Sequence, residues 1–181
     1  MHSKSQVGVT LIEMACVLAV LSILGGIAGP SMYKWRQRAA ADGLISALTT
    51  DIALARITAI SRGSTAVLCP SHDANGCDGA ADWRDGWIVF LDANRDRSRQ
   101  PEEELLSVAQ ARRIPALGFA STSGRRTIRL FPSGMAYGSN LTVTSCLDGN
   151  THARLVMNNV GRVRVERPRA PVACPSGAPT P

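Results

Sequence analysis

The first third of the chain carries two different helical patterns of hydrophobic positions. Residues 9–29 form an apolar run of 21 residues in which Glu13 is the one charged side chain. A helix of that length crosses the hydrocarbon core of a bilayer, so the pattern predicts a membrane-spanning helix over residues 9–30. The run ends with Gly25, Gly26, Gly29 and Pro30, which predict a kink at this point.

Beyond Pro30 the pattern changes from uniformly apolar to amphipathic. Small and aliphatic residues recur at alternating spacings of three and four, which place them on one face of a helix; they are Ile45, Leu48, Ile52, Ala55 and Ala59. Gly63 suits the left-handed residue that ends many helices. The sequence therefore predicts a helical segment over residues 31–63 that packs against a globular domain.

After Gly63, short runs of aliphatic, β-branched and aromatic residues alternate with Gly, Pro, Asn and Asp, which is typical of strands joined by turns. No linker divides the region, so residues 64–181 form one β-rich domain with an irregular tail from Pro168. The fold class is α+β, a long N-terminal helix packed on antiparallel β-sheets, and the aromatic content of 4% predicts an aliphatic core. The predicted strands are 65–69, 87–92, 104–109, 127–131, 141–146, 153–158 and 161–166.

The charge changes sign along the chain. Residues 9–104 carry 9 Lys and Arg against 12 Asp and Glu, whereas residues 105–181 carry 10 Arg against 2 acidic residues. Guanidinium groups pair bidentately with phosphate, so the basic C-terminal half favours an anionic partner. A genome rich in G and C explains the preference for Arg over Lys but not the asymmetry between the halves.

The eight residues before the apolar run, MHSKSQVG, predict how the N-terminus is processed. A secretory signal peptide has its small-residue cleavage site after the apolar segment, whereas here the small residue Gly8 precedes it. A small residue in this order leaves the apolar helix on the mature protein.

The stretch GVTLIE, followed by the apolar helix, resembles the class III signal of type IV pilins and type II secretion pseudopilins. The resemblance implies that a prepilin peptidase removes residues 1–8, cutting between Gly8 and Val9, and N-methylates Val9. It also implies that Glu13 meets the N-terminal amine of a neighbouring subunit during assembly. The expected location is the bacterial inner membrane, single-pass with the globular domain in the periplasm, and the cell-surface pilus after assembly.

A second stretch, LCPSHDANGCDGAADWRDGWIVFLDANRD, is similar to the minor pilins and pseudopilins of the GspH/FimT type. A Gly-Arg-x-Arg motif near the C-terminus also matches, at Gly161, Arg162 and Arg164. The resemblance implies a type IV pilin-like fold and assembly with other pilins or pseudopilins through the N-terminal helix. The positions that match in the first stretch are Cys69, Pro70, Ser71, Asp73, Asp82, Trp83, Gly86, Trp87, Phe90 and Asp92.

Four of the five cysteines lie in the predicted domain, and an oxidising periplasm favours disulfides. Four cysteines allow three pairings, of which we favour Cys69 with Cys77 across a tight loop and Cys146 with Cys174 near the tail. Cys16 in the apolar helix is expected to be an ordinary buried small residue. A zinc site formed by Cys69, His72 and Cys77 is an alternative, although it has no clear fourth ligand.

The segment DANRDRSRQPEE is a second candidate metal site. Its oxygen-bearing side chains fall at positions 1, 3, 5, 7, 9 and 12 of an EF-hand-like loop; they are Asp92, Asn94, Asp96, Ser98, Gln100 and Glu103. Arg97 occupies position 6, where an EF-hand needs Gly, and no helical pattern flanks the loop. A polar hairpin loop is the better interpretation, and we predict neither a metal site nor a cofactor.

No motif for catalysis is found in the sequence. It contains no G-x-S-x-G, no H-E-x-x-H and no P-loop. Two histidines, His72 and His152, remain after the predicted cleavage, and nothing aligns them with a nucleophile. We therefore expect a protein without enzymatic activity.

The C-terminal segment NNVGRVRVERPRAP carries the arginines that we expect to bind DNA. In a strand, Arg162 and Arg164 share one face while the valines between them face the core, and alternate residues lie about 6.6–6.8 Å apart, comparable with the phosphate spacing of a nucleic-acid strand. The resemblance links members with this motif to DNA binding in natural transformation. Further candidate contacts are Arg167, Arg169, Arg112 and Arg113, and additional charge comes from Arg125, Arg126 and Arg129.

Such binding is expected to be non-specific, dependent on salt and directed at double-stranded DNA. Phosphate contacts release counterions and read no sequence, and no aromatic side chain is interleaved with the C-terminal arginines to stack on bases. The preferred function is a minor pilin of a type IV pilus that helps to initiate or tip the fibre and binds DNA. The alternatives are a type II secretion pseudopilin without DNA binding, a pilus priming or adhesion subunit, and a solvated edge strand whose charges block pairing.

Overall fold

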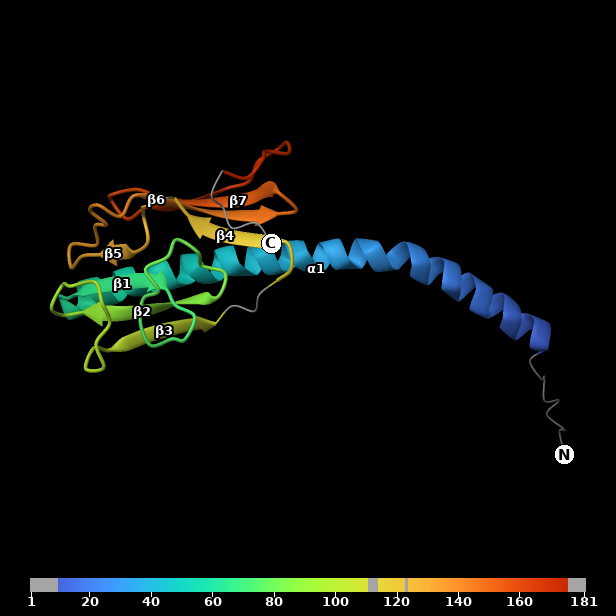
Figure 1. The fold of residues 1–181 in the computed structure, drawn as a ribbon, viewed down its shortest axis with the longest axis horizontal. Helices are drawn as coiled ribbons and strands as arrows, with labels where there is room; N and C mark the ends of the chain where they lie inside the picture. Colours follow the sequence, from blue (N-terminus) through green and yellow to red (C-terminus); the bar gives the residue numbers. More distant parts are fainter. Residues whose placement is uncertain (1–9, 111–113, 123, 176–181) are drawn as a thin grey trace, which may run out of the picture. The chain divides into compact units, whose positions relative to one another are not determined.

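The computed structural model describes residues 10–110, 114–122 and 124–175, apart from the side chains of residues 27–30. The chain divides into two compact units, residues 1–36 and 37–181, and each is described by itself. In the described residues we find one helix and eight strands (Figure 1), namely α1 (Leu11–Arg62), β1 (Thr65–Pro70), β2 (Gly86–Asp92), β3 (Leu105–Gln110), β4 (Leu117–Ser121), β5 (Ile128–Leu130), β6 (Leu141–Leu147), β7 (Asn150–Met157) and β8 (Val163–Glu166).

Helix α1 begins directly after Thr10, which caps it. The hydroxyl and carbonyl oxygens of Thr10 accept the Glu13 amide at 3.3 and 3.1 Å, satisfying an N–H that has no acceptor within the helix. The helix continues through Pro30 without interruption, and the predicted kink there stays a prediction. All side chains of residues 11–26 are exposed, and this part of α1 is long and apolar enough to cross a membrane.

The second half of α1 supplies one side of the domain core. The predicted stripe of five residues is buried, and Ala41 extends it by one turn. Three of the six are alanines, whose small side chains let the sheets approach the helix backbone closely. The helix ends at Arg62, and Gly63 follows in the left-handed conformation with φ +62°, so the predicted end is confirmed.

The eight strands form two antiparallel sheets of four strands each. Sheet A has the order β3-β2-β1-β5, and sheet B has the order β4-β6-β7-β8. All seven predicted strands are present, but the sequence does not predict β4. Its sequence LGFAS is short, contains Gly and Ala and has no polar alternation, and all five residues are buried. Hydrogen bonds from Trp83 N to Phe119 O and from Ser121 N to Ala81 O hold it in place, both at 2.8 Å.

The core lies between α1 and the inner faces of both sheets (Figure 1). The expectation of an aliphatic core is confirmed, and three aromatic side chains lie among the aliphatic ones. The Trp87 ring centroid lies 6.3 Å from that of Trp83 and 6.1 Å from that of Phe119. Trp87 Nε1 donates to Asp51 Oδ2 at 2.7 Å, so the buried carboxylate of α1 has its partner inside the domain.

Strands β1 and β2 are buried on both faces. On the outer face of sheet A, Val67, Cys69, Ile88 and Phe90 form a second apolar cluster. The loop between β1 and β2 covers this cluster with Ala74 and Cys77. The alternation of buried and exposed residues that is typical of half-buried strands is therefore missing here, because a loop replaces the solvent on the outer face.

Candidate nucleic-acid interface

Strand β8 lies at the edge of sheet B and carries the alternation that the sequence predicts. Of the described strands it pairs with β7 alone. Val163 and Val165 pack against the core, whereas Arg164 and, one residue before the strand, Arg162 are exposed. The two arginines therefore lie on the solvent face of the sheet, on a strand that its valines hold in place.

The turn between β7 and β8 fixes the position of Arg162. Asn158 Oδ1 accepts the backbone N–H of Arg162 at 2.9 Å, and Arg56 Nη1 donates to the carbonyl of Gly161 at 3.3 Å. Gly161 has φ +77°, and a Cβ there would lie 2.9 Å from the carbonyl oxygen of Gly134. Only glycine fits such a close contact in this conformation, which gives the Gly of the Gly-Arg-x-Arg motif a structural reason.

Arg164 shares the outer face of sheet B with two other charged residues. Its Nε donates to Glu166 Oε1 at 2.7 Å, and both side chains are largely exposed. Glu166 faces Arg154 of β7 in the register, so Arg154 points to the same side. Exposed ion pairs contribute at most about 1 kcal/mol, so Arg164 can exchange its carboxylate for a phosphate. Sequence reasoning misses Arg154 because the register across the strands is not visible in the sequence.

Arg167 does not join this face. Its Nη2 donates to Asp42 Oδ1 of α1 at 3.0 Å, and His152 Nε2 lies 3.1 Å from the same oxygen. Burial raises the pKa of Asp42, but the hydrogen bonds from Arg167 and His152 outweigh this effect and lower it. The contact ties the end of β8 to the helix, so Arg167 has a structural partner that the sequence does not reveal.

Of the remaining candidate arginines, one is described by the structure and two are not. Arg169 is exposed beyond the end of β8. Arg112 and Arg113 lie outside the described residues, as do Gly8 and Val9 at the predicted cleavage site. We define the β8 ridge as Arg154, Arg162 and Arg164, the three arginines that the fold brings to one side of sheet B.

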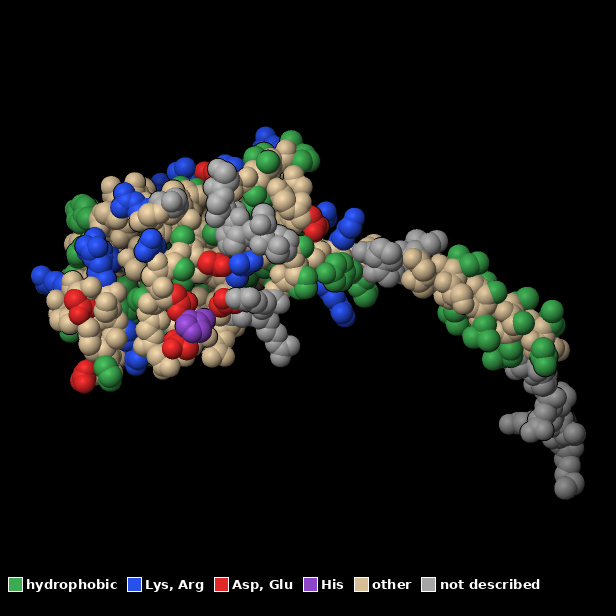
Figure 2. Space-filling view, in the orientation of Figure 1, with side chains coloured by type: hydrophobic (Ala, Val, Ile, Leu, Met, Phe, Trp, Pro, Cys, Tyr) green, Lys and Arg blue, Asp and Glu red, His purple; other side chains and the backbone are tan. Residues whose placement is uncertain are grey.

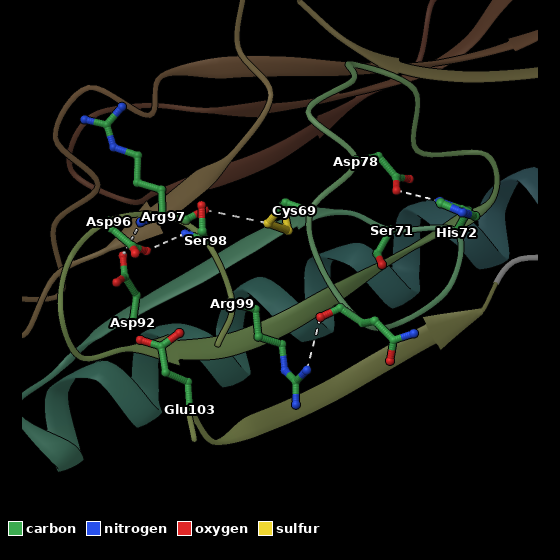
Figure 3. The surroundings of a disulfide bond; sticks show 12 residues. Cys69, Ser71, His72, Asp78, Asp92, Asp96, Arg97, Ser98, Arg99 and Glu103 are labelled. Atoms are coloured by element: carbon green, nitrogen blue, oxygen red, sulfur yellow. Dashed lines mark hydrogen bonds and ion pairs between the residues drawn. A yellow bond between two sulfur atoms is a disulfide. The ribbon is translucent and has the colours of Figure 1, made fainter. Parts of the chain in front are cut away.

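Both favoured disulfides are present. Cys69 is bonded to Cys77 and Cys146 to Cys174. The zinc alternative is wrong, because sulfurs joined to each other are not available as thiolate ligands. His72 Nδ1 lies instead 2.6 Å from Asp78 Oδ1, a hydrogen bond that raises the pKa of His72 (Figure 3). Cys16 is free and exposed within its unit, rather than buried.

The EF-hand-like segment forms the hairpin loop between β2 and β3, which confirms the polar hairpin loop that the sequence favours. Its carboxylates accept backbone N–H groups of their own loop: Asp92 from Arg97 at 3.2 Å, Asp96 from Ser98 at 2.8 Å and Glu103 from Ala93 at 2.8 Å. Among the described residues no group of three or more His, Cys, Asp or Glu is placed to hold a metal ion. The acidic side chains of this loop therefore organise its backbone.

Glu13 sits in the first turn of α1 and is exposed. Its backbone N–H is capped by Thr10, but its carboxylate has no partner among the residues that the structure describes. A carboxylate in the first turn suits the positive end of the helix dipole. The Glu13 carboxylate is therefore available to a partner outside the described residues of its own chain.

Comparison with known proteins identifies the family. The family model described as type II transport protein GspH matches residues 44–161. The pilin-like protein PilA1 of Thermus thermophilus is 28% identical over 167 residues, which cover 88% of this chain and 97% of that protein. The crystal structure of the type IV minor pilin FimU of Pseudomonas aeruginosa is similar in fold, with a TM-score of 0.54 and 20% identity over 73% of this chain and 92% of FimU.

These matches agree with the architecture. The family match runs from the second half of α1 to the turn before β8, and the similarity to FimU shows the type IV pilin-like fold, a long apolar N-terminal helix followed by antiparallel sheets. The family is one of structural pilins and not of enzymes. The chain belongs to the GspH family and is a single-pass, membrane-anchored, pilin-like protein of the GspH/FimT type.

Proposed function

We propose that the chain is a minor pilin of a type IV pilus that binds DNA non-specifically and serves DNA uptake in natural transformation. The observation that carries the proposal is the β8 ridge, in which Arg162 and Arg164 are exposed beside Val163 and Val165 of an edge strand. Arg154 lies next to them on β7, on the same side of the sheet. Arginines at fixed positions on a rigid strand contact successive phosphates without reading sequence. The names of PilA1 and FimU support membership of a pilus.

The proposal includes the route to the fibre. A prepilin peptidase cuts between Gly8 and Val9 and N-methylates Val9, the helix anchors the chain in the inner membrane, and the domain lies in the periplasm. Glu13 then meets the amine of Val9 in a neighbouring pilin, which compensates both buried charges. The carboxylate of Glu13, unpartnered among the described residues, supports this step.

The ridge is tested by a gel shift with the full chain in detergent and a duplex of arbitrary sequence. Arg162→Gln combined with Arg164→Gln is expected to abolish retardation at moderate salt and to reduce the slope of log K against log salt by about 2. Arg36→Gln with Arg38→Gln removes the same charge from exposed positions of α1 and is the matched control. An unchanged shift in the ridge variant, with both proteins equally folded, contradicts the site.

A variant that is expected to strengthen DNA binding gives a second test of the ridge. Glu166→Gln removes the carboxylate that holds Arg164 at 2.7 Å, so it frees a guanidinium and removes the repulsion between Glu166 and phosphate. Binding is expected to become tighter and its salt slope steeper. Weaker binding of this variant would place the DNA elsewhere on the domain.

A second function is favoured by the family description, which names a type II transport protein. As a minor pseudopilin near the tip of a secretion fibre, the domain would contact partner pseudopilins or secreted proteins and would not need DNA. A deletion strain separates the two functions: loss of transformation supports the pilus function, whereas loss of secretion with normal transformation supports the pseudopilin.

A further inference from the structure

A second group of arginines lies at β5, which is an edge strand of sheet A. Arg125 lies before β5 and its Nη1 donates to the carbonyl of Gly138 at 2.7 Å. Arg129 belongs to β5, and its Nη2 lies 3.4 Å from the position that a Cβ on Gly138 would take. Both guanidinium groups therefore lie against the same short loop, residues 131–140, which follows β5.

Arg97 reaches the same region from the loop between β2 and β3. Partial burial lowers the pKa of Arg129, and the positive charge of Arg97 lowers it further, while the charge of Asp92 opposes this effect. Arg97 adopts φ +69°, which is uncommon for an arginine, and the buried Asp92 accepts its backbone N–H. Figure 3 shows the Arg97 guanidinium pointing away from the carboxylates of Asp92 and Asp96.

None of these three arginines forms an ion pair with a carboxylate of the described residues. Figure 2 shows several Lys and Arg side chains, with a few Asp and Glu side chains among them, at the end of the domain where β5 and the β2–β3 loop lie in Figure 1. Asp92 offsets only part of the repulsion between these like charges, so a polyanion bound here relieves more of it.

Two aromatic rings stand beside these charges. The guanidinium carbon of Arg129 lies 5.6 Å from the centroid of the Phe131 ring, within cation–π distance. The Phe131 ring in turn lies 6.1 Å from the Tyr137 ring, at an angle of 50°. Tyr137 is 55% exposed, and among the described residues from Gln37 onward it is the only aromatic side chain exposed to this degree. Arg129, Phe131 and Tyr137 thus form a row of neighbouring side chains that ends in an exposed ring.

The loop with Tyr137 is joined to the turn that begins the β8 ridge. Ala136 N donates to Asn159 O at 2.9 Å, and Gly161 is in close contact with Gly134. Tyr137 directly follows Ala136, and Arg162 directly follows Gly161. The two basic regions therefore belong to neighbouring loops of one rigid structure.

We propose that Tyr137 is a base-stacking platform, and that Arg97, Arg125 and Arg129 contact the phosphates of a single-stranded DNA segment lying over it. We call Arg97, Arg125, Arg129, Phe131 and Tyr137 the Tyr137 patch. The inference rests on the proposed function and deepens it, because it adds a site for single-stranded segments beside the ridge that contacts the duplex. Bases in a duplex cannot reach a ring on the protein surface, whereas every unpaired base has a face that stacks on an aromatic side chain.

Residues 125–137 hold four of the five members of the patch, but the exposure of Tyr137 is not visible in the sequence. The arrangement favours nucleic acid over an acidic protein, because a ring flanked by arginines on one surface is the combination that single-strand binding sites use. A partner pilin is the competing occupant, since Tyr and Arg are also enriched at protein interfaces. The experiment below decides between them.

The test measures fluorescence anisotropy of a labelled oligothymidylate and of a duplex of the same length, with the full chain in detergent. Tyr137→Leu is expected to weaken binding of the single strand about tenfold to a hundredfold, the effect of losing one stacked base, and to leave duplex binding unchanged. Tyr137→Phe keeps the ring and is expected to bind like the wild type. Arg125→Gln with Arg129→Gln is expected to weaken single-strand binding and lower its salt dependence.

The outcomes separate this inference from the proposed function. If Tyr137→Leu binds the single strand as the wild type does, the inference is wrong, and an accompanying loss of incorporation into fibres then identifies the patch as a subunit interface. Duplex binding that depends on Arg162 and Arg164 supports the proposed function in either case. If the wild-type chain binds neither form of DNA, both proposals fail. Because Tyr137 is exposed, the variants are expected to keep the melting temperature of the wild type, and that measurement excludes misfolding as the cause of weaker binding.

Discussion

The two halves of helix α1 differ in how far their apolar and acidic side chains are buried. From Leu11 to residue 26 every side chain is exposed, although most are apolar. From Gln37 onward one stripe of six residues is buried under two sheets, while polar side chains cover most of the rest of the helix. The carboxylates repeat the contrast, because Asp51 is buried against Trp87 Nε1 and Glu13 has no side-chain partner among the described residues.

The difference shows which apolar residues of α1 are buried within the chain's own domain and which need a bilayer or another chain to bury them. The second half completes a core of its own, so its residues are explained by folding stability. The first half exposes apolar surface that water does not tolerate in a monomer, so its residues are explained by a bilayer or by neighbouring pilin helices. Substitutions of the same chemistry in the two halves should therefore affect different measurements.

The largest effect is expected from Glu13→Ala. Removing one member of a buried ion pair leaves the other uncompensated and costs about 3–5 kcal/mol, so the variant should be almost absent from purified fibres while remaining in the membrane fraction. Immunoblots of both fractions measure this. Asp51→Asn is the matched control, since it retains an acceptor for Trp87 Nε1 and should still be incorporated. Normal incorporation of Glu13→Ala contradicts a registration role for Glu13.

A second contrast compares two leucines of the same helix. Leu48 is fully buried, and Leu48→Ala leaves a cavity that is expected to destabilise the domain by about 2–5 kcal/mol. Leu18 is 60% exposed, and Leu18→Ala is expected to leave the unfolding of the domain unchanged. Thermal unfolding of the full chain in detergent, followed by near-ultraviolet circular dichroism of the buried tryptophans, compares them. Equal destabilisation would mean that the first half packs against the domain.

The elements that the sequence predicts are those whose signals are local. The stripe from Ile45 to Ala59 repeats at helical spacing, and the alternation of Val163 and Val165 with arginines marks a strand within four residues. Strand β4 has no such signal, because burial between Trp83 and β6 stabilises a segment of weak propensity. The positions of Trp83, Trp87 and Phe119 within the mainly aliphatic core are missed for a related reason, since composition counts the rings but does not place them.

The candidate interface is predictable only in part, because it depends on contacts between distant segments. The exposure of Arg162 and Arg164 follows from strand period alone. The capture of Arg167 by Asp42 joins residues 125 positions apart, and the alignment of Arg154 with Glu166 depends on the strand register. Four of the five members of the Tyr137 patch fall within residues 125–137, so the sequence does bring them close together. The exposure of Tyr137 and the approach of Arg97 from the β2–β3 loop depend on the fold.

The disulfide near the tail tests how far the core alone stabilises the domain. Cys146 and Cys174 close a separation of 28 residues, and a cross-link of this kind typically adds about 2–4 kcal/mol. Cys146→Ala with Cys174→Ala is expected to lower the melting temperature of the domain without changing insertion of the first half of α1. Reduction of the wild type is not equivalent, because it also exposes the Cys69–Cys77 bond to the reductant. No change in melting temperature would assign all of the stability to the packing around α1.

The smallest expected effect concerns the charged contact between α1 and sheet B. Because hydrogen bonds from Arg167 and His152 lower the pKa of Asp42 below its ordinary value of 3.8, folding is favoured by this group above that value. The contribution is lost as the pH falls through the lower, folded pKa. Asp42 is 44% exposed, so solvent screening limits the contribution to under about 1 kcal/mol.

Asp42→Asn should therefore be slightly less stable than the wild type at pH 7 and equal to it at pH 2, as measured by urea unfolding at both values. A double-mutant cycle with Arg167→Gln assigns the difference to this pair. A stability difference that is the same at both pH values contradicts the electrostatic account. In that case Asp42 matters through its packing on the helix, and Arg167 would be available to the β8 ridge after all.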